Sequence, residues 1–219
     1  VNVREVPAAF KLIFQSAFTS DAAIGAFSGI TVKMAMRYGM SRAVFSNEAG
    51  LGSAPIAHAA ATTDHPVRQG LWGIFEVFVD TIIICTITAL TILVTGVIDS
   101  GESGVALTTL AFEKGISGLG GYIVTLGIML FAFSTSISWS FYGERSLEFL
   151  FGPKSTKFYR IVWIPTIFVG AIGGLDLVWD IADTLNGLMA IPNLIGIIGL
   201  SSVVVRLTKE FFAREGIDY

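Results

Sequence analysis

A polar segment interrupts two apolar stretches near residue 50 of the chain. It reads SNEAGLGSAPIAHAAATTDHP from Ser46 to Pro66, and Gly50, Gly52 and Pro55 break what would otherwise be a helix. Inside a bilayer, the backbone groups freed by such a break must be buried in protein or line a cavity. The start of the second half-helix favours a carboxylate, and the carbonyls that end the first half favour a cation or an ammonium group. The segment therefore has the chemistry to hold a small zwitterion such as an amino acid.

An ordinary re-entrant or aqueous loop would use the same glycines for turning, and spacing alone leaves the two interpretations about even. A nucleotide-binding loop is excluded because GLGSAP lacks the lysine of a Walker loop and follows no strand. Trp139 is a further candidate that could line a substrate pocket, although a packed core aromatic is at least as good an interpretation. The candidate substrate-binding residues are Phe45, Asn47, Gly50, Leu51, Gly52, Ser53 and Trp139.

The composition places this segment in a membrane protein. Of the 219 residues 53% are hydrophobic and only 14% are charged, whereas soluble domains carry about 25% charged residues. Long charge-free stretches lie between Asp80 and Asp99, between Lys114 and Glu144, and between Asp183 and Arg206. Each is close to or above the roughly 18 residues of a transmembrane helix. The formal net charge of −3 gives no basic surface for nucleic acid.

The chain is predicted to be an all-α, polytopic integral membrane protein with a single membrane domain. Residues 1–29 are expected to form a loop and an amphipathic helix, and residues 30–63 a discontinuous helix around the break. Four spans follow, at residues 70–97, 121–142, 161–174 and 182–205. The last of these contains Pro192, which commonly bends a helix.

Basic residues orient the spans, because Lys and Arg are enriched in cytoplasmic loops. The loop YGERSLEFLFGPKSTKFYR carries four of them and is placed inside. The two other connections, after residue 97 and around residue 175, hold one lysine between them and are placed outside. One bent last span then leaves the C-terminal tail, with Arg206, Lys209 and Arg214, in the cytoplasm.

The stretch SNEAGLGSAPIAHAAA, followed by FVDTIIICTITALTIL, resembles the alanine or glycine:cation symporter family, the sodium:alanine symporters. The resemblance extends over essentially the whole chain, which would be the C-terminal half of such a transporter. It implies a leucine-transporter-like fold of two inverted five-helix repeats, of which this chain is the second, with a discontinuous first helix. The missing N-terminal repeat would supply the other half of the site.

Hydroxyl groups in the span FAFSTSISWSFYGE are the candidate sodium ligands. Small hard cations prefer oxygen ligands, and the resemblance implies that this helix of the repeat lends neighbouring hydroxyls to sodium. The candidates are Ser134, Thr135 and Ser138. Asp80 is a candidate coupling acid, because intramembrane acids face a cavity or a partner, while the threonines after it are expected to bond between helices. His58 and His65 have no second ligand at metal spacing, and a proton-coupling role for them is the weaker alternative to packing and loop roles.

The resulting hypothesis is sodium-coupled symport of alanine or glycine by alternating access, in the cell membrane of a prokaryote. No cofactor is expected besides the coupling ion. The alternatives are an ion channel, a transporter of another solute and coupling to protons. An enzyme would need a nucleophile–base pair or a metal cluster, and the sequence shows neither. Sequence alone leaves open whether the substrate is alanine, glycine or serine.

Overall fold

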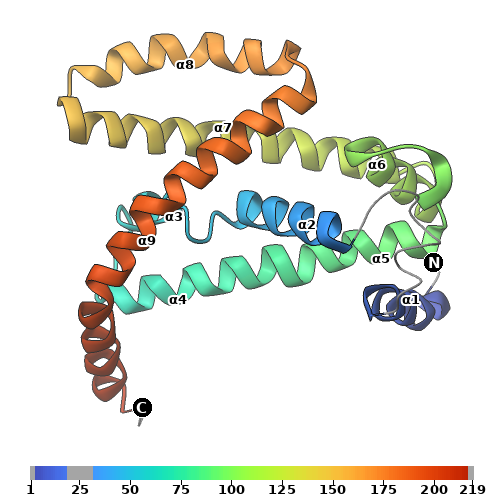
Figure 1. Ribbon diagram of the computed structural model, residues 1–219, viewed down its shortest axis with the longest axis horizontal. Helices are drawn as coiled ribbons and strands as arrows, with labels where there is room; N and C mark the ends of the chain where they lie inside the picture. The colour runs from blue at the N-terminus through green and yellow to red at the C-terminus, as the bar shows by residue number, and fades with distance from the viewer. Residues whose placement is uncertain (1–2, 19–31, 217–219) are drawn as a thin grey trace. The chain divides into compact units, whose positions relative to one another are not determined.

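The computed structural model describes residues 3–18 and 32–216, and every regular element among them is helical (Figure 1). The elements are η1 (Val3–Glu5), α1 (Val6–Phe18), α2 (Val32–Asn47), α3 (Ala54–His58), α4 (Pro66–Val77), the π-helix η3 (Phe78–Ile84), α5 (Cys85–Thr95), η4 (Ile98–Ser100), α6 (Gly104–Gly115), α7 (Gly120–Phe151), α8 (Ser155–Ile172) and α9 (Leu175–Arg214).

Three helical stretches are long and apolar enough to cross a membrane, namely Pro66–Thr95, Gly120–Phe151 and Leu177–Arg214. They contain 30, 32 and 38 residues, and at 1.5 Å per residue each exceeds the thickness of the hydrocarbon core, about 30 Å. Little of their most apolar windows is buried within the chain, at 0%, 11% and 0%. Their apolar surface is therefore available to lipid or to other protein. The prediction of an all-α chain with apolar helices long enough to cross a membrane is confirmed for the described residues.

The predicted ranges differ from the observed helices mainly at their ends. Residues 70–97 correspond to α4, η3 and α5, residues 121–142 lie within α7, and residues 182–205 lie within α9, which continues through Pro192. Residues 161–174 overlap α8, which falls outside the three candidate spans since Lys157 and Arg160 occupy its first turns. Within the predicted range 1–29 the structure describes η1 and α1, and residues 19–29, like the start of the discontinuous helix at 30–31, lie outside the described residues.

The predicted cytoplasmic loop after residue 142 is largely helical. Helix α7 continues to Phe151 and α8 begins at Ser155, because polar side chains pair along and between the two helices. Arg145 bonds Glu148 one turn later at 2.7 Å, and the buried Glu144 accepts two bonds from Arg160 at 2.9 and 2.6 Å. The two helices are consequently joined by a short turn, in which Gly152 has a φ of +81°. The connection after residue 97, predicted as a loop, likewise contains α6.

The helix break has a specific backbone conformation. Helix α2 ends at Asn47 and α3 begins at Ala54. Between them Glu48, Gly50 and Gly52 all have positive φ angles, of 54°, 86° and 83°, which interrupt the helical hydrogen bonds. Glycine adopts this left-handed region without steric cost, whereas Glu48 does so under strain. Pro55 at the start of α3 lacks an N–H that the first helical turn would leave unpaired in any case.

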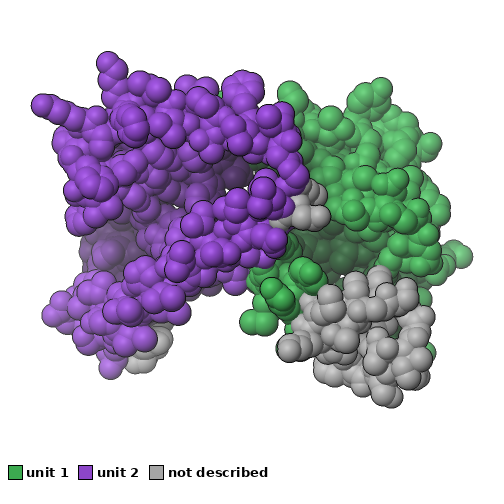
Figure 2. Space-filling model, turned by 45° about the horizontal axis from the view of Figure 1, so that its top comes forward, with its two compact units in different colours: residues 1–42, 79–134 green, residues 43–78, 135–219 purple. Residues whose placement is uncertain are grey.

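The chain divides into two compact units, residues 1–42 with 79–134 and residues 43–78 with 135–219 (Figure 2). In the first unit α5 packs against α6 and α1. There the carboxylate of Glu113 accepts hydrogen bonds from the backbone N–H groups of Gly118 and Gly121, at 2.7 and 2.8 Å. In the second unit α4 packs against α3 and α9. The second unit contains the helix break and the pocket described below.

Arg68, near the start of α4, holds the end of α9. Its guanidinium donates to Asp64 at 2.9 Å and to Glu215 at 2.8 Å, and its central carbon lies 5.3 Å from the ring centroid of Phe211. The His65 ring lies 5.1 Å from the same phenylalanine, which is only 5% exposed. The start of α4 and the end of α9 are thus joined by charge pairs and ring contacts.

Candidate functional site

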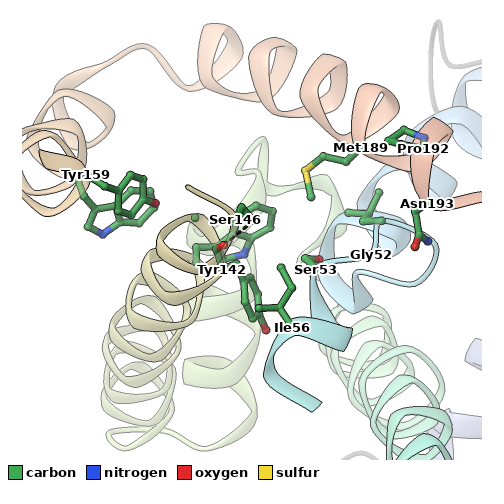
Figure 3. Close-up of a pocket in the computed structure, with 13 residues that line it drawn as sticks. Gly52, Ser53, Ile56, Tyr142, Ser146, Tyr159, Met189, Pro192 and Asn193 are labelled. Carbon is green, nitrogen blue, oxygen red and sulfur yellow. Dashed lines mark hydrogen bonds between the residues drawn. The ribbon is translucent and has the colours of Figure 1, made fainter. Parts of the chain in front are cut away.

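A cavity of about 440 Å³ lies in the second unit, between the helix break, α7, α8 and α9 (Figure 3). Pockets for small organic ligands commonly measure a few hundred cubic ångströms or more. The residues that line it are Leu51, Gly52, Ser53, Ile56, Trp139, Tyr142, Gly143, Ser146, Tyr159, Trp163, Met189, Pro192 and Asn193. The pocket therefore combines broken backbone, hydroxyl and amide groups with an aromatic wall.

Asn193 of α9 fixes the backbone of the break. Its side-chain N–H donates to the carbonyl oxygen of Gly50 at 2.9 Å, across 143 residues of sequence. The α-carbon of Gly52 lies against the same amide group, and a Cβ added there would be 2.8 Å from Asn193 Oδ1. Glycine is required at this position both for the close approach and for the positive φ. Figure 3 shows Gly52 and Asn193 facing each other at one end of the pocket.

Ser53 and Glu48 form a second link within the break. The Ser53 hydroxyl donates to Glu48 Oε2 at 2.7 Å, and Ser53 is only 2% exposed. Ser53 occupies the N-cap position of α3, yet its side chain makes no capping bond because it turns to Glu48 instead. With its proton committed to the carboxylate, the Ser53 oxygen keeps its lone pairs for another donor. This arrangement offers a polarised acceptor to a positively charged group in the pocket.

Aromatic rings from α7 and α8 make the opposite side of the pocket. The rings of Trp139 and Tyr142 meet edge to face with centroids 5.9 Å apart, and those of Tyr159 and Trp163 stack at 5.7 Å. Gly143 allows the two helices to approach, because a Cβ there would collide with the Tyr159 hydroxyl. The Ser146 hydroxyl donates to the Tyr142 carbonyl at 2.8 Å, as drawn in Figure 3.

Four of the predicted substrate-binding residues line this pocket, namely Leu51, Gly52, Ser53 and Trp139. The other three, Phe45, Asn47 and Gly50, are not among the residues that line it. The Phe45 ring packs edge-on against Trp179 with centroids 5.0 Å apart, Asn47 Oδ1 accepts the Ala49 N–H at 2.9 Å, and Gly50 receives the Asn193 bond. Asn47 and Gly50 thus take part in hydrogen bonds that fix the backbone of the break, and Phe45 packs against α9.

The candidate sodium ligands and the candidate coupling acid do not line the pocket. Ser134, Thr135 and Ser138 are on α7, and the Ser134 hydroxyl donates to the Phe131 carbonyl at 3.0 Å. Ser134 belongs to the first unit and the other two to the second. Asp80 lies in the π-helix η3, a rare element that often occurs at functional sites. No group of three metal-binding His, Cys, Asp or Glu side chains occurs among the described residues.

The threonines after Asp80 do not make the bonds between helices that were predicted. The hydroxyls of Thr88, Thr91 and Thr95 donate to carbonyls four residues earlier in their own helix, at 3.0, 2.8 and 2.7 Å. Such bonds use the hydroxyl proton without a neighbouring helix, so the expectation of bonds donated between helices is wrong for these three threonines.

Sequence reasoning missed most of the pocket, including Tyr142, Ser146, Tyr159, Met189 and Asn193. A signal for Asn193 was available, because an amide in the middle of an apolar stretch is expensive unless it has a partner. The IPN motif at residues 191–193 was instead interpreted only as a helix bend at its proline. The aromatic residues carry no comparable signal, since the same residues pack in ordinary cores.

The chain is similar in sequence to known transport proteins over nearly its whole length. Residues 1–217 match the model of the sodium:alanine symporter family. The chain is 49% identical over 215 residues to the sodium/alanine symporter AgcS of Methanococcus maripaludis, covering 96% of this chain and 46% of that protein. It is 46% identical over 221 residues to an uncharacterized transporter of Haemophilus influenzae, covering 100% and 48%. It is 41% identical over 212 residues to a protein named "Probable sodium/glutamine symporter GlnT" of Bacillus subtilis, covering 96% and 44%.

The chain spans about half the length of the relatives it matches. The matched family is one of transporters rather than enzymes, and its match covers nearly all of this chain. Together with the three apolar helices, this identifies a membrane protein. The chain belongs to the sodium:alanine symporter family.

Proposed function

We propose that the transporter containing this chain carries a small neutral amino acid, alanine or glycine, across the cell membrane together with sodium. The observation that carries the proposal is the helix break, held open by Asn193 and Glu48 beside a pocket of about 440 Å³. The family match and the 49% identity to a sodium/alanine symporter support the substrate class. The fold proposed for the whole protein is leucine-transporter-like, with this chain as the second inverted repeat.

The ends of a zwitterionic substrate differ in what they require. Its ammonium group would donate to the Ser53 oxygen, whose hydroxyl proton is already bound by Glu48. Its carboxylate would accept from the backbone N–H groups of Gly52 and Ser53 at the end of the break, since those of Glu48, Ala49 and Leu51 already donate within the chain. Its side chain would face Ile56, Met189 and Trp139. These side chains are largely apolar, so they favour a methyl group over a charged group.

Sodium would bind on α7 at Ser134, Thr135 and Ser138, with carbonyl oxygens completing its coordination, and Asp80 would serve as a coupling acid. Transport would proceed by alternating access, in which bound sodium and substrate stabilise each other's sites by an equal free energy. Substitutions Thr135→Ala and Ser138→Ala should then raise the sodium concentration needed for half-maximal uptake more than they affect maximal uptake. If both variants respond to sodium like wild type, these residues are not ligands.

The orientation follows from the basic residues. The basic residues at the end of α9 and around the turn from α7 to α8 would lie in the cytoplasm. They are Arg206, Lys209 and Arg214, and Arg145, Lys154, Lys157 and Arg160. The C-terminal end of the described chain would therefore be cytoplasmic, in a multi-pass protein of a prokaryotic plasma membrane.

The deciding experiment is uptake of labelled alanine by the full-length transporter in proteoliposomes. An inward sodium gradient should drive accumulation above equilibrium, and collapsing that gradient with a sodium ionophore should abolish accumulation while substrate remains chemically unchanged. Glycine and glutamine are added as competitors, because one relative is named for glutamine. Uptake that is indifferent to sodium, or currents that do not saturate with substrate, would overturn the proposal.

A further inference from the structure

A group of titratable and amide side chains joins α3 to α4 beside the helix break. His58 is the last residue of α3, and its Nε2 lies 3.2 Å from Glu76 Oε2. Its other ring nitrogen, Nδ1, lies 2.8 Å from Gln69 Nε2. Both partners are on α4, so the imidazole is held at its two nitrogens by a single neighbouring helix. The His58 side chain is 21% exposed, and Glu76 is 61% exposed.

The position of Glu76 favours this contact. Glu76 lies ten residues after Pro66 in a candidate membrane span, about 15 Å along the helix axis. A carboxylate at such a depth is costly unless it is paired or faces a cavity. Among the described residues, Glu76 pairs with His58.

The three side chains can satisfy two protonation states. With a neutral imidazole, Nδ1 accepts the Gln69 amide N–H and Nε2–H donates to the Glu76 carboxylate. When a proton from water adds to Nδ1, both ring nitrogens become donors. The Gln69 amide then turns by half a rotation and presents its carbonyl oxygen to Nδ1–H. No hydrogen bond is lost, and the contact to Glu76 becomes an ion pair.

The remaining charged groups nearby have contacts of their own. Glu48 in the break accepts the Ser53 hydroxyl, and Arg68 on α4 pairs with Asp64 and Glu215. On α7, Tyr142 lies within electrostatic range of both Glu48 and Glu76. The carboxylate that contacts His58 within the described part of the chain is therefore that of Glu76.

We infer that His58, Glu76 and Gln69 form a proton-binding site that controls the helix break. Helix α3 is short and carries Ile56 of the pocket two residues before His58, with Ser53 directly before its first residue. Proton binding strengthens the hold of α4 on α3 and thereby sets the position of the pocket residues. The affinity for an amino-acid substrate then depends on pH. This last consequence, but not the proton site itself, rests on the proposed function.

The test measures the KM of alanine uptake between about pH 5 and 8, the range in which imidazole changes charge. We expect the wild-type KM to depend on pH in this range and His58→Gln to abolish that dependence. Glu76→Gln removes the negative charge that favours imidazolium, and it should move the midpoint to lower pH. Gln69→Glu adds such a charge at Nδ1 and should move the midpoint to higher pH.

The matched control is His65→Asn, which removes the other histidine of this chain. His65 caps α4 by accepting the Val67 N–H, and asparagine is a good residue for that position. This variant should keep the wild-type pH profile. A wild-type profile in His58→Gln, or midpoints that move in the same direction in Glu76→Gln and Gln69→Glu, would overturn the inference.

A second measurement does not depend on transport. The full-length protein with 13C-labelled histidine rings should show an NMR signal that titrates between about pH 5 and 8, is absent in His58→Gln and shifts oppositely in the other two variants. If this signal titrates while sodium-driven uptake is absent, the proposed function fails and the proton site stands. If it does not titrate, the proton site is refuted whatever the uptake shows.

Discussion

Asn193 donates a hydrogen bond to the carbonyl of Gly50, so a helix near the C-terminal end of the chain holds open a helix break near its start. The two residues are 143 positions apart in sequence. The same amide covers the α-carbon of Gly52, which leaves no space for a side chain there. The conformation of the break is thus specified by α9 as well as by its own glycines.

Replacing Asn193 by leucine, which has a similar shape but no N–H, should leave the Gly50 carbonyl without its partner. A partly buried acceptor left unpaired costs about 1–3 kcal/mol. Since 1.4 kcal/mol corresponds to tenfold, we expect the KM for uptake of the proposed substrate alanine to rise by roughly fivefold to a hundredfold. The matched control is Ser201→Ala on the same helix, where the hydroxyl bonds only the Ile198 carbonyl. Equal KM values in the two variants would contradict a role for the Asn193 bond.

Gly52→Ala and Gly50→Ala separate backbone strain from collision. Both glycines have positive φ angles, so alanine at either position costs about 1–3 kcal/mol in strain. Only at Gly52 would the new Cβ meet the Asn193 side chain, whereas the space around Gly50 is open. We expect Gly52→Ala to reduce uptake severely and Gly50→Ala to reduce it less.

The double variant Gly52→Ala with Asn193→Ala tests the collision directly. Removing the asparagine side chain should recover part of the alanine binding, measured by scintillation proximity on purified protein. No recovery would mean that the strained backbone, rather than the contact with α9, excludes side chains at residue 52.

The Glu144–Arg160 pair should stabilise the hairpin of α7 and α8. Glu144 is 8% exposed and accepts two short bonds, while the Arg160 side chain is 66% exposed and can be hydrated when its partner is lost. We expect Glu144→Gln to lower the free energy of unfolding by about 1–2 kcal/mol, the range of hydrogen bonds to charged groups discounted for solvent exposure. Thermal unfolding in detergent measures the change.

The control for this substitution is Glu210→Gln on α9. Glu210 lies 3.8 Å from Arg206, and both side chains are more than half exposed. Exposed pairs contribute about 0–1 kcal/mol, so the melting temperature should hardly change. A fall in melting temperature equal to that of Glu144→Gln would show that the Glu144–Arg160 pair stabilises the protein no more than an exposed pair does.

Acid should destabilise the C-terminal end of α6 by protonating the carboxylate of Glu113. Hydrogen bonds from the backbone N–H groups of Gly121 and Gly118 lower the pKa of this carboxyl below its usual 4.5. A carboxyl with a lowered folded pKa stabilises the fold above its unfolded pKa, and the stabilisation is lost as the pH falls through the folded value. Hydrogen exchange of the segment from α6 to Gly121 should therefore accelerate below about pH 4.5 in wild type. In Glu113→Gln the segment should exchange faster at neutral pH and show no such acid step.

Local features of the sequence predicted the broad architecture well. Charge-free stretches mark the long helices because lipid excludes charge, and Gly50, Gly52 and Pro55 mark the break because each disfavours a continuous helix. The ends of the helices were missed where polar pairs extend them, as between Arg145 and Glu148. Such pairs form only once the helix exists, so hydropathy does not reveal them.

The pocket was harder to predict because it depends on contacts between distant residues. Trp139 was predicted to line the pocket, as the structure shows. Tyr159 and Asn193 were not predicted, because their places in the pocket depend on how α8 and α9 pack. The π-helix around Asp80 was also missed, since it departs from the period of 3.6 residues on which helical faces are assigned.

The contact of Arg68 with Glu215 has a consequence for labelling experiments. Two side chains 2.8 Å apart must be reached from the same aqueous compartment, whichever compartment that is. Cysteines introduced at Thr63 and Ala213, close to this contact on either segment, should therefore react together with a membrane-impermeant thiol reagent. The reagent is added separately to intact cells and to inverted vesicles. Both cysteines should react in the same one of these two preparations.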